Sequence, residues 1–157
     1  MEYKISANEA FNKYSDMVYR LAFARVKNKY DADDVLQEVF LRFIKYAKKP
    51  NNEEHTKALL IRMTINCSKT LLSSAFLKKT QPLDENISVT MPERDTLEAV
   101  FALPVKYRTV VHLHYYCGYS VDEIAEILTT KPSTVKSQLH RARQKLKLSL
   151  EGNECNV

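Results

Sequence analysis

The chain contains 157 residues, of which 45% are hydrophobic and 27% are charged, and its formal net charge is +5. A chain of this length can bury one ordinary core or two small ones, and the composition excludes an intrinsically disordered protein. Only two glycines occur, and the apolar residues recur at helical spacing without alternating runs, so the sequence predicts an all-α fold.

The first two predicted elements are amphipathic helices. One spans Asn8 to Val26 and ends at a polar break, Lys27 to Tyr30. The second covers roughly residues 32–48, and the carboxylates of the preceding segment, Asp31 to Asp34, are expected to cap its start. Its predicted buried stripe consists of Val35, Leu36, Val39, Phe40, Phe43, Ile44 and Ala47.

The side of the second helix opposite this stripe carries an acidic and amide patch. Asp34, Gln37 and Glu38 fall together there because residues three and four apart share a helix face. In a cationic protein, such a patch suits a basic protein surface better than the phosphates of a nucleic acid. Spacing alone equally allows Asp34 and Glu38 to be ordinary carboxylates of a first helical turn.

A polar loop and a third helix come next. The loop is predicted from Asn51 to Thr56, and the helix from about Lys57 to Phe76. The loop amides and Asn66 suit contacts with unstacked bases, while cations such as Arg62 suit the nucleic acid backbone. The alternative interpretation is an ordinary solvent-exposed helix face.

Residues 80–95, TQPLDENISVTMPERD, predict an acidic linker. Residues 80–103 hold five acidic side chains against one basic side chain, a local charge of −4, which leaves +9 on the two flanking blocks. Both blocks are therefore candidates for nucleic acid binding. The predicted organisation is a first domain over 1–79, the linker, a second domain over 96–150 and a frayed tail at 151–157.

The second block predicts two supporting helices followed by a helix-turn-helix. The first supporting helix runs from Asp95 or Thr96 to Ala102; the second opens at Pro104 and is closed by Gly118. The stretch from Tyr119 to Lys147 then reads as two helices with a short break.

The helix-turn-helix has recognisable start signals and one poorly fitting residue. Ser120 and Glu123 form a capping box, and Pro132 suits the first turn of the second helix. In the break, Thr129 stands where a glycine would most easily supply a positive φ. Either Thr129 is strained or the turn adopts another geometry.

The second helix of this motif separates a narrow apolar stripe from a basic and polar face. The stripe consists of Val135, Leu139, Ala142 and Leu146, and no acidic residue occurs from Lys131 to Lys147. Hydroxyls, amides and cations without acids suit phosphates and base edges in a major groove. The outward face is predicted to contain Ser133, Lys136, Ser137, His140, Arg141 and Gln144.

The sequence shows no metal-binding or catalytic constellation. The three cysteines lie at no metal-ligand spacing, and His112, His114 and Cys117 cannot converge on one ion from a helix. No phosphate-binding glycine loop and no paired general acid and base are present. Without a signal peptide or an apolar run of about 18 residues, the chain is expected to be cytoplasmic, with reduced thiols and without metal, cofactor or small-molecule substrate.

From about Phe11 to Lys147, these motifs in this order resemble bacterial RNA polymerase sigma factors of the extracytoplasmic-function (ECF) group. The segment from Asp31 to Arg42, DADDVLQEVFLR, looks like the part of sigma region 2 that docks on the polymerase clamp helices. The motifs at Leu103–Pro104, Tyr107–Arg108, Ser120, Glu123–Ala125, Thr134–Ser137 and His140–Arg143 look like the promoter-binding region 4.

The resemblance implies a sigma factor with a region 2-like bundle and a region 4-like helix-turn-helix joined by a flexible linker. Such a protein, which is not an enzyme, would bind core RNA polymerase, direct it to specific promoters and assist promoter opening. An anti-sigma factor, often membrane-bound in this group, is the further implied partner.

The resemblance also implies site residues. Asp34, Gln37 and Glu38 would contact the core enzyme. The minus-ten element would be contacted by Asn51, Asn52, His55, Thr56, Lys57, Arg62 and Asn66. The minus-thirty-five element would be contacted by Lys131, Ser133, Thr134, Lys136, Ser137, His140 and Arg141.

Three positions depart from the usual family pattern. Leu59 replaces a tryptophan beside the strand-separating loop, which argues against an aromatic wedge there. Thr129 replaces the turn glycine, and Gln138 replaces a basic residue after the recognition serine. The last two changes predict minus-thirty-five contacts that are weaker or read a different sequence.

Two other hypotheses remain. A free-standing helix-turn-helix regulator would need a dimer and a symmetric operator, and would leave the acidic patch without a role. A nucleic-acid-processing domain could use Asp33, Asp34 and Glu38 as metal ligands, but no further acid is placed to complete an octahedral site.

Overall fold

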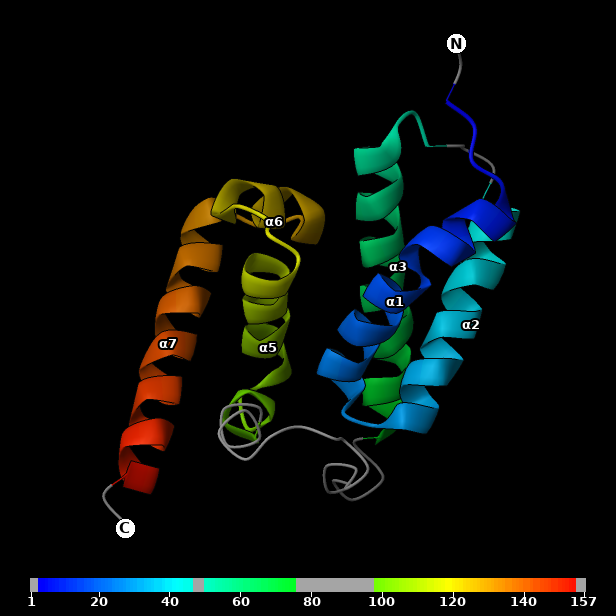
Figure 1. Cartoon of the computed structure of the whole chain (residues 1–157). Helices are drawn as coiled ribbons and strands as arrows, with labels where there is room; N and C mark the ends of the chain where they lie inside the picture. The colour runs from blue at the N-terminus through cyan, green and yellow to red at the C-terminus, as the bar shows by residue number, and fades with distance from the viewer. Residues whose placement is uncertain (1–2, 47–49, 76–97, 155–157) are drawn as a thin grey trace. The chain divides into compact units, whose positions relative to one another are not determined.

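The computed structural model describes residues 3–46, 50–75 and 98–154, which fall into two compact units, Met1–Asp84 and Glu85–Val157. The described residues form helices and turns without a strand, which confirms the all-α prediction (Figure 1). The predicted linker, 80–95, and the start predicted for the helix at Asp95 or Thr96 lie outside the described residues.

The N-terminal unit is a bundle of three helices, α1 (Ala7–Val26), α2 (Lys29–Lys45) and α3 (Glu53–Ala75), each of which packs against the other two. The bundle buries the apolar stripe of each helix in one core. The buried residues of this core are Ala10, Tyr14, Val18, Ala22, Ala32, Val35, Val39, Phe40, Phe43, Leu59, Leu60 and Cys67.

Helix α2 begins earlier than predicted. Asn28 is its N-cap, because the side-chain oxygen accepts hydrogen bonds from the backbone N–H groups of Tyr30 (2.8 Å) and Asp31 (3.1 Å). The prediction that the carboxylates of residues 31–34 cap the helix is therefore wrong, since these residues lie within its first two turns. Most of the predicted stripe is buried, but Ile44 is 56% exposed, and Ala47 lies outside the described residues.

Helix α3 also begins earlier than predicted, at Glu53. The side-chain oxygen of Asn52 accepts the His55 N–H at 2.7 Å, which makes Asn52 the capping residue. The predicted polar loop therefore shrinks, because His55 and Thr56 belong to the first helical turns. Thr56 is fully buried.

The C-terminal unit packs α5 (Val105–Val111) and α6 (Val121–Leu128) against the long helix α7 (Pro132–Glu154). Residues 98–101 are helical, and Pro104 precedes α5 as predicted. Helix α7 runs four residues beyond Leu150, into the stretch where a frayed tail is predicted. The core of the unit consists of Val110, Leu113, Ile124, Val135, Leu139 and Ala142.

Helix α5 continues as a π-helical segment, η1 (His112–Tyr116), before the chain turns at Gly118 with φ +76°. The Cys117 N–H donates to the His112 carbonyl, five residues back, at 3.1 Å, which is the wider π spacing. The wider turn changes the direction of the side chains that follow, and Tyr115 is 56% exposed.

The helix-turn-helix starts as predicted and turns through a strained residue. Ser120 and Glu123 make both hydrogen bonds of the capping box, each at 3.1 Å. Thr129 adopts φ 55° and ψ 52°, the left-handed region that favours glycine, so the strained alternative is the one observed. The Thr130 N–H donates to the Ala125 carbonyl and the Thr129 N–H to the Glu126 carbonyl, as in a Schellman helix end.

Replacing Thr129 by glycine is expected to stabilise the folded chain by about 1 kcal/mol, since the left-handed conformation costs a side-chain-bearing residue about that much. The matched control, Thr130→Gly, changes a neighbour whose φ is not positive and should lower stability. Urea unfolding followed by circular dichroism measures both. Equal destabilisation by the two variants would show that Thr129 is not strained.

Candidate functional site

Helix α2 presents an exposed face that combines acidic, amide and apolar side chains. Asp34, Gln37 and Glu38 are all exposed, as the sequence predicts. The Arg42 Nε donates to Glu38 Oε1 at 2.9 Å, and this hydrogen bond raises the pKa of Arg42. An exposed pair of this kind is weak, so a partner's cation can replace Arg42 at Glu38 at little cost.

Three large apolar residues border this patch and were missed by the sequence analysis. Tyr30 is 77%, Leu41 53% and Ile44 56% exposed. Leu41 lies four residues and Ile44 seven residues after Gln37, so both project from the same side of α2. For Ile44 the sequence could have indicated exposure, because this residue lies at the edge of the predicted buried stripe. We call these six residues, Tyr30, Asp34, Gln37, Glu38, Leu41 and Ile44, the α2 face.

A second group of polar residues runs from the turn before α3 along one side of that helix. Asn51 and Asn52 are exposed in the turn. His55, Arg62 and Asn66 follow at spacings of seven and four, which places them on one stripe. The stripe covers about 20 Å at a rise of 1.5 Å per residue. We call these five residues, Asn51, Asn52, His55, Arg62 and Asn66, the α3 stripe.

Two contacts predicted from the resemblance, Thr56 and Lys57, do not belong to the α3 stripe. Thr56 is buried, and its hydroxyl donates to the Asn52 carbonyl at 2.9 Å, so it is not available to a base. Lys57 is half-buried and lies about 140° around α3 from Arg62, at 100° per residue. Leu59, which replaces the family tryptophan, is buried in the core of the bundle.

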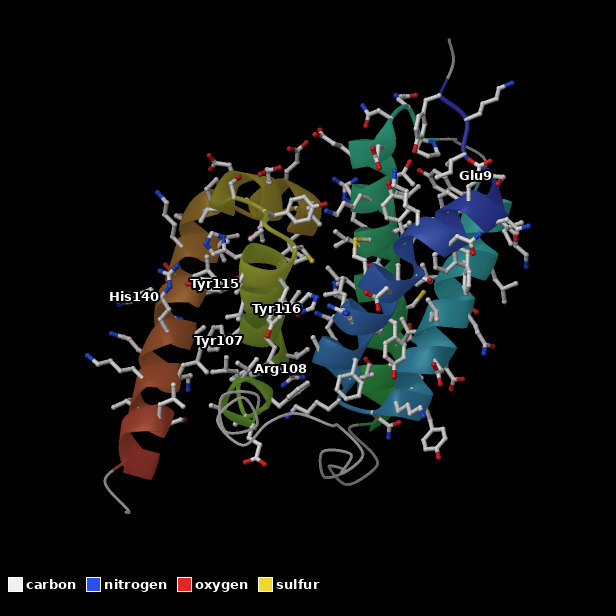
Figure 2. The ribbon with its side chains drawn as sticks, viewed as in Figure 1. Glu9, Tyr107, Arg108, Tyr115, Tyr116 and His140 are labelled. Carbon is white, nitrogen blue, oxygen red and sulfur yellow. The ribbon has the colours of Figure 1, made fainter. Side chains whose placement is uncertain are left out.

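A third group lies on the outward side of α7. Ser133, Lys136, Ser137 and His140 are exposed, and His140 projects away from α5 (Figure 2). Lys131, just before the helix, and Thr134 and Arg141 on it are also exposed. Gln138 is half-buried with its amide oxygen buried, which places this position off the outward side.

Tyrosines of the preceding segment hold two arginines at the edges of α7. Arg141 hydrogen-bonds the Tyr107 hydroxyl and thereby lowers the pKa of Tyr107. Arg143 Nε donates to the Tyr115 hydroxyl at 2.7 Å, and its guanidinium lies 5.8 Å from the centre of the Tyr115 ring. The π-helical turn exposes Tyr115 where this bond forms. Both guanidiniums are therefore held in place before any partner arrives.

The side of Lys136 and His140 is more basic than predicted. Arg143 and Lys147 lie seven and eleven residues after Lys136, so they fall on its edge of α7. Neither was in the predicted set, although both belong to the acid-free stretch that ends at Lys147. We call the exposed residues Lys131, Ser133, Thr134, Lys136, Ser137, His140 and Arg141, together with Arg143, the α7 face.

The described part of the chain holds no group of three or more histidine, cysteine, aspartate or glutamate side chains that could bind a metal ion. Among the described residues, Asp34 and Glu38 therefore have no third side chain with which to bind a metal ion. Among the described helices, none is both long and apolar enough to span a membrane.

Comparisons with known proteins identify the family of the two units. Residues 10–75 match the family model of sigma-70 region 2, and residues 94–146 match that of sigma-70 region 4. The RNA polymerase sigma factor SigV of Bacillus subtilis is 31% identical over 147 residues, which cover 84% of this chain and 83% of SigV. The ECF sigma factor SigW of the same organism is 27% identical over 163 residues, which cover 87% of this chain and 84% of SigW.

Solved structures show the same fold. The sigma factor RpoE of Bartonella quintana, solved in complex with the anti-sigma factor NepR, superposes with a TM-score of 0.72 at 17% identity, covering 92% of this chain and 96% of RpoE. CnrH, solved in complex with the cytosolic domain of CnrY, gives a TM-score of 0.69 at 20% identity, covering 93% of this chain and 88% of CnrH. With both region models matched in order, the chain belongs to the extracytoplasmic-function group of bacterial RNA polymerase sigma factors, alternative sigma factors that act in transcription initiation.

Proposed function

We propose that this sigma factor divides its task among the three exposed faces: the α2 face binds core RNA polymerase, the α3 stripe captures the minus-ten element, and the α7 face reads the minus-thirty-five element. The observation that carries the proposal is that each face has one distinct chemistry. The α2 face is acidic and apolar, the α3 stripe is rich in amides, and the α7 face is cationic and hydroxylic.

The chemistry of the α2 face fits a protein partner. Its carboxylates repel DNA phosphates, and its three exposed apolar side chains gain from contact with another protein surface. A basic segment of the polymerase core is the matching partner, with Arg42 displaced from Glu38 as the complex forms.

The α3 stripe fits unpaired DNA. Amide side chains at Asn51, Asn52 and Asn66 can both donate to and accept from the Watson–Crick edges of bases, which are open only where the strands are separated. Arg62 supplies a cation for the backbone. Because Thr56 and Lys57 point elsewhere, we assign them a supporting role and no direct contact.

The α7 face fits duplex DNA. Lys136, Ser137 and His140 project from the outward side, where a helix entering the major groove meets base edges, and Lys131 and Thr134 lie near the helix start, where phosphates bind. Arg141 and Arg143, held by their tyrosines, are ordered cations for the flanking phosphates.

We further propose that the chain is not itself an enzyme, that it works in the cytoplasm with the polymerase, and that it is controlled by an anti-sigma factor. The relatives are sigma factors, which supply promoter recognition to a polymerase that performs the chemistry. Two structural neighbours were solved as complexes, RpoE with the anti-sigma factor NepR and CnrH with the cytosolic domain of CnrY. This precedent supports an anti-sigma partner for this chain.

The test is whether promoter recognition requires the core enzyme. Only six basic residues lie between Lys131 and Lys147. They should give the free chain weak, salt-sensitive affinity for duplex DNA, in the range of about 10⁻⁴–10⁻⁶ M typical of non-specific binding. Bound to core polymerase, the chain should select promoters, because two linked modules bind with a high effective concentration. Gel shifts with and without core enzyme, on promoters isolated by the holoenzyme, measure this. A tight, sequence-specific shift by the free chain at physiological salt would contradict the proposal.

A further inference from the structure

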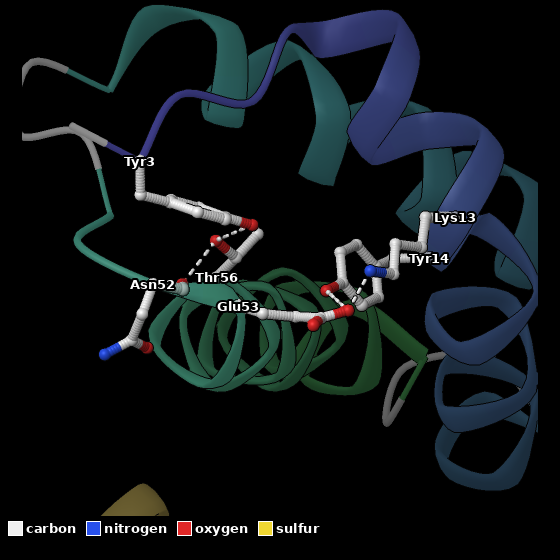
Figure 3. A network of polar contacts seen from close by, with 6 residues as sticks. All are labelled: Tyr3, Lys13, Tyr14, Asn52, Glu53 and Thr56. Carbon is white, nitrogen blue, oxygen red and sulfur yellow. Dashed lines mark hydrogen bonds and ion pairs between the residues drawn. The ribbon is translucent and has the colours of Figure 1, made fainter. Parts of the chain in front are cut away.

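The turn that begins the α3 stripe is held by residues of the N-terminal segment and α1 that have no assigned role. Tyr3, Lys13 and Tyr14 reach the first turn of α3, where they meet Glu53 and Thr56 (Figure 3). These contacts join residues about 40 to 53 positions apart in the sequence, as the pairs Tyr14–Glu53 and Tyr3–Thr56 show. They therefore fix the turn relative to α1, not only within α3.

The Asn52 carbonyl oxygen and side-chain oxygen both accept hydrogen bonds. Its carbonyl accepts the Thr56 N–H at 3.0 Å and the Thr56 hydroxyl at 2.9 Å, and its side-chain oxygen accepts the His55 N–H. The Thr56 hydroxyl also lies 3.3 Å from the Tyr3 hydroxyl. What remains for a ligand is the Asn52 side-chain NH₂, which points away from Tyr3 and Thr56 (Figure 3).

Glu53 is held by two groups of α1. Its Oε1 accepts a hydrogen bond from the Tyr14 hydroxyl at 3.2 Å and forms an ion pair with Lys13. Tyr14 is 5% exposed, so its ring is fixed in the core and its hydroxyl cannot follow a displaced carboxylate. Burial raises the pKa of Tyr14, which keeps the hydroxyl protonated and able to donate.

The contacts of Glu53 reduce electrostatic repulsion between its carboxylate and the phosphates of a bound strand. Glu53 is the residue next to Asn52, so its carboxylate could lie beside the phosphates of any strand that contacts Asn51 and Asn52. A carboxylate 4 Å from a phosphate charge costs about 1 kcal/mol in water and more in a less polar site. Bound to Tyr14 and Lys13, the Glu53 carboxylate is turned toward α1 and its charge is offset.

We propose that Tyr14 and Lys13 are positioning residues for minus-ten capture: they draw the Glu53 carboxylate toward α1, so that its negative charge does not compete when Asn51 and Asn52 meet an unpaired strand. The proposal rests on the minus-ten role proposed above for the α3 stripe. It assigns a function in DNA binding to two residues of α1 that are not expected to touch DNA.

The decisive variants are Tyr14→Phe, which keeps the ring in the core, and Lys13→Met. The probe is a single-stranded non-template oligonucleotide carrying a minus-ten sequence selected from a random library by the wild-type holoenzyme. Lys13→Met, bound to core polymerase, should bind this probe about fivefold more weakly, as expected for one uncompensated charge. Tyr14→Phe, which removes one of the two contacts but leaves the cation, should weaken binding by a smaller factor. Adding Glu53→Gln to either variant should restore binding, and high salt should shrink the defect by screening. Core affinity and the unfolding midpoint should stay close to wild type.

Two controls make the outcome unambiguous. Arg20→Met removes the cation of another exposed ion pair on α1, with Asp16, and should leave probe binding unchanged. Asn52→Ala tests the α3 stripe itself. If Asn52→Ala weakens binding while Tyr14→Phe and Lys13→Met behave like Arg20→Met, the positioning role is wrong and the proposed function stands. A defect that Glu53→Gln does not rescue also overturns the role. If Asn52→Ala has no effect, the minus-ten assignment fails and the positioning role fails with it.

Discussion

Replacing Asp34, Gln37 and Glu38 together by alanine is expected to weaken binding to core RNA polymerase at least about 100-fold, because truncating a central interface residue commonly costs about 2 kcal/mol or more. All three side chains are exposed on α2, and the one ion pair among them, between Glu38 and Arg42, is also exposed. The bundle should therefore fold normally. Titration of labelled chain with core enzyme, with circular dichroism as the folding check, measures the effect.

Helix α1 supplies a matched control. Glu9, Asn12 and Asp16 are also two acids and an amide, they are exposed, and they lie on one helix face. Their triple replacement by alanine removes the same charge and should leave polymerase binding unchanged. Equal loss in both triple variants would indicate a general effect of charge. If the α2 variant keeps full affinity for core polymerase, another surface of the chain makes that contact and the proposed role of the α2 face is wrong.

The helix faces of this fold could be predicted from the sequence because burial in a bundle follows the 3.6-residue period. Val35, Val39 and Phe43 recur at that period and are buried. The helix starts were harder, because asparagine and aspartate are about equally good caps. At the start of α2, Asn28 competes with Asp31, and only the path of the chain out of α1, with Lys27 at φ 59°, decides between them. The π-helical turn at His112–Tyr116 left no signal that the sequence analysis could use.

In the candidate site, too, the sequence predicted features within one helix but not contacts between helices. The acidic patch and the basic face follow from spacing within one helix, so the sequence was sufficient for them. The contacts that orient their neighbours are not local. Arg143 meets Tyr115 across 28 positions, and Tyr14 meets Glu53 across 39. Such pairs depend on how helices pack. The dependence on packing explains why sequence reasoning found the exposed patches and missed the tyrosines that hold Arg143 and Glu53 in place.

Replacing Lys136 by glutamate is expected to abolish specific promoter recognition by the holoenzyme, with a fall in affinity of about 100-fold. Two effects add: a direct contact in the major groove is worth about 1–3 kcal/mol, and the new carboxylate repels phosphates on a face that has no acid between Lys131 and Lys147. Lys136 is exposed between Ser133 and His140, so the change should not disturb the core. Affinity for core polymerase should be unaffected, since we propose that the α2 face makes that contact.

Lys145→Glu is the matched control for this prediction. It makes the same charge change on the same helix, but residue 145 lies at the other edge of the α7 face, four residues after Arg141 and about 180° around α7 from residue 136. The pair therefore tests whether the loss depends on the position of the new charge. Holoenzyme carrying each variant is measured by transcription from a native promoter and from one with a scrambled minus-thirty-five element. Lys136→Glu should reduce the native promoter to the level of the scrambled one, whereas Lys145→Glu should preserve the difference between them. If the two variants lose the same amount, α7 contributes only its overall charge, and the sequence of the minus-thirty-five element must be read by other residues.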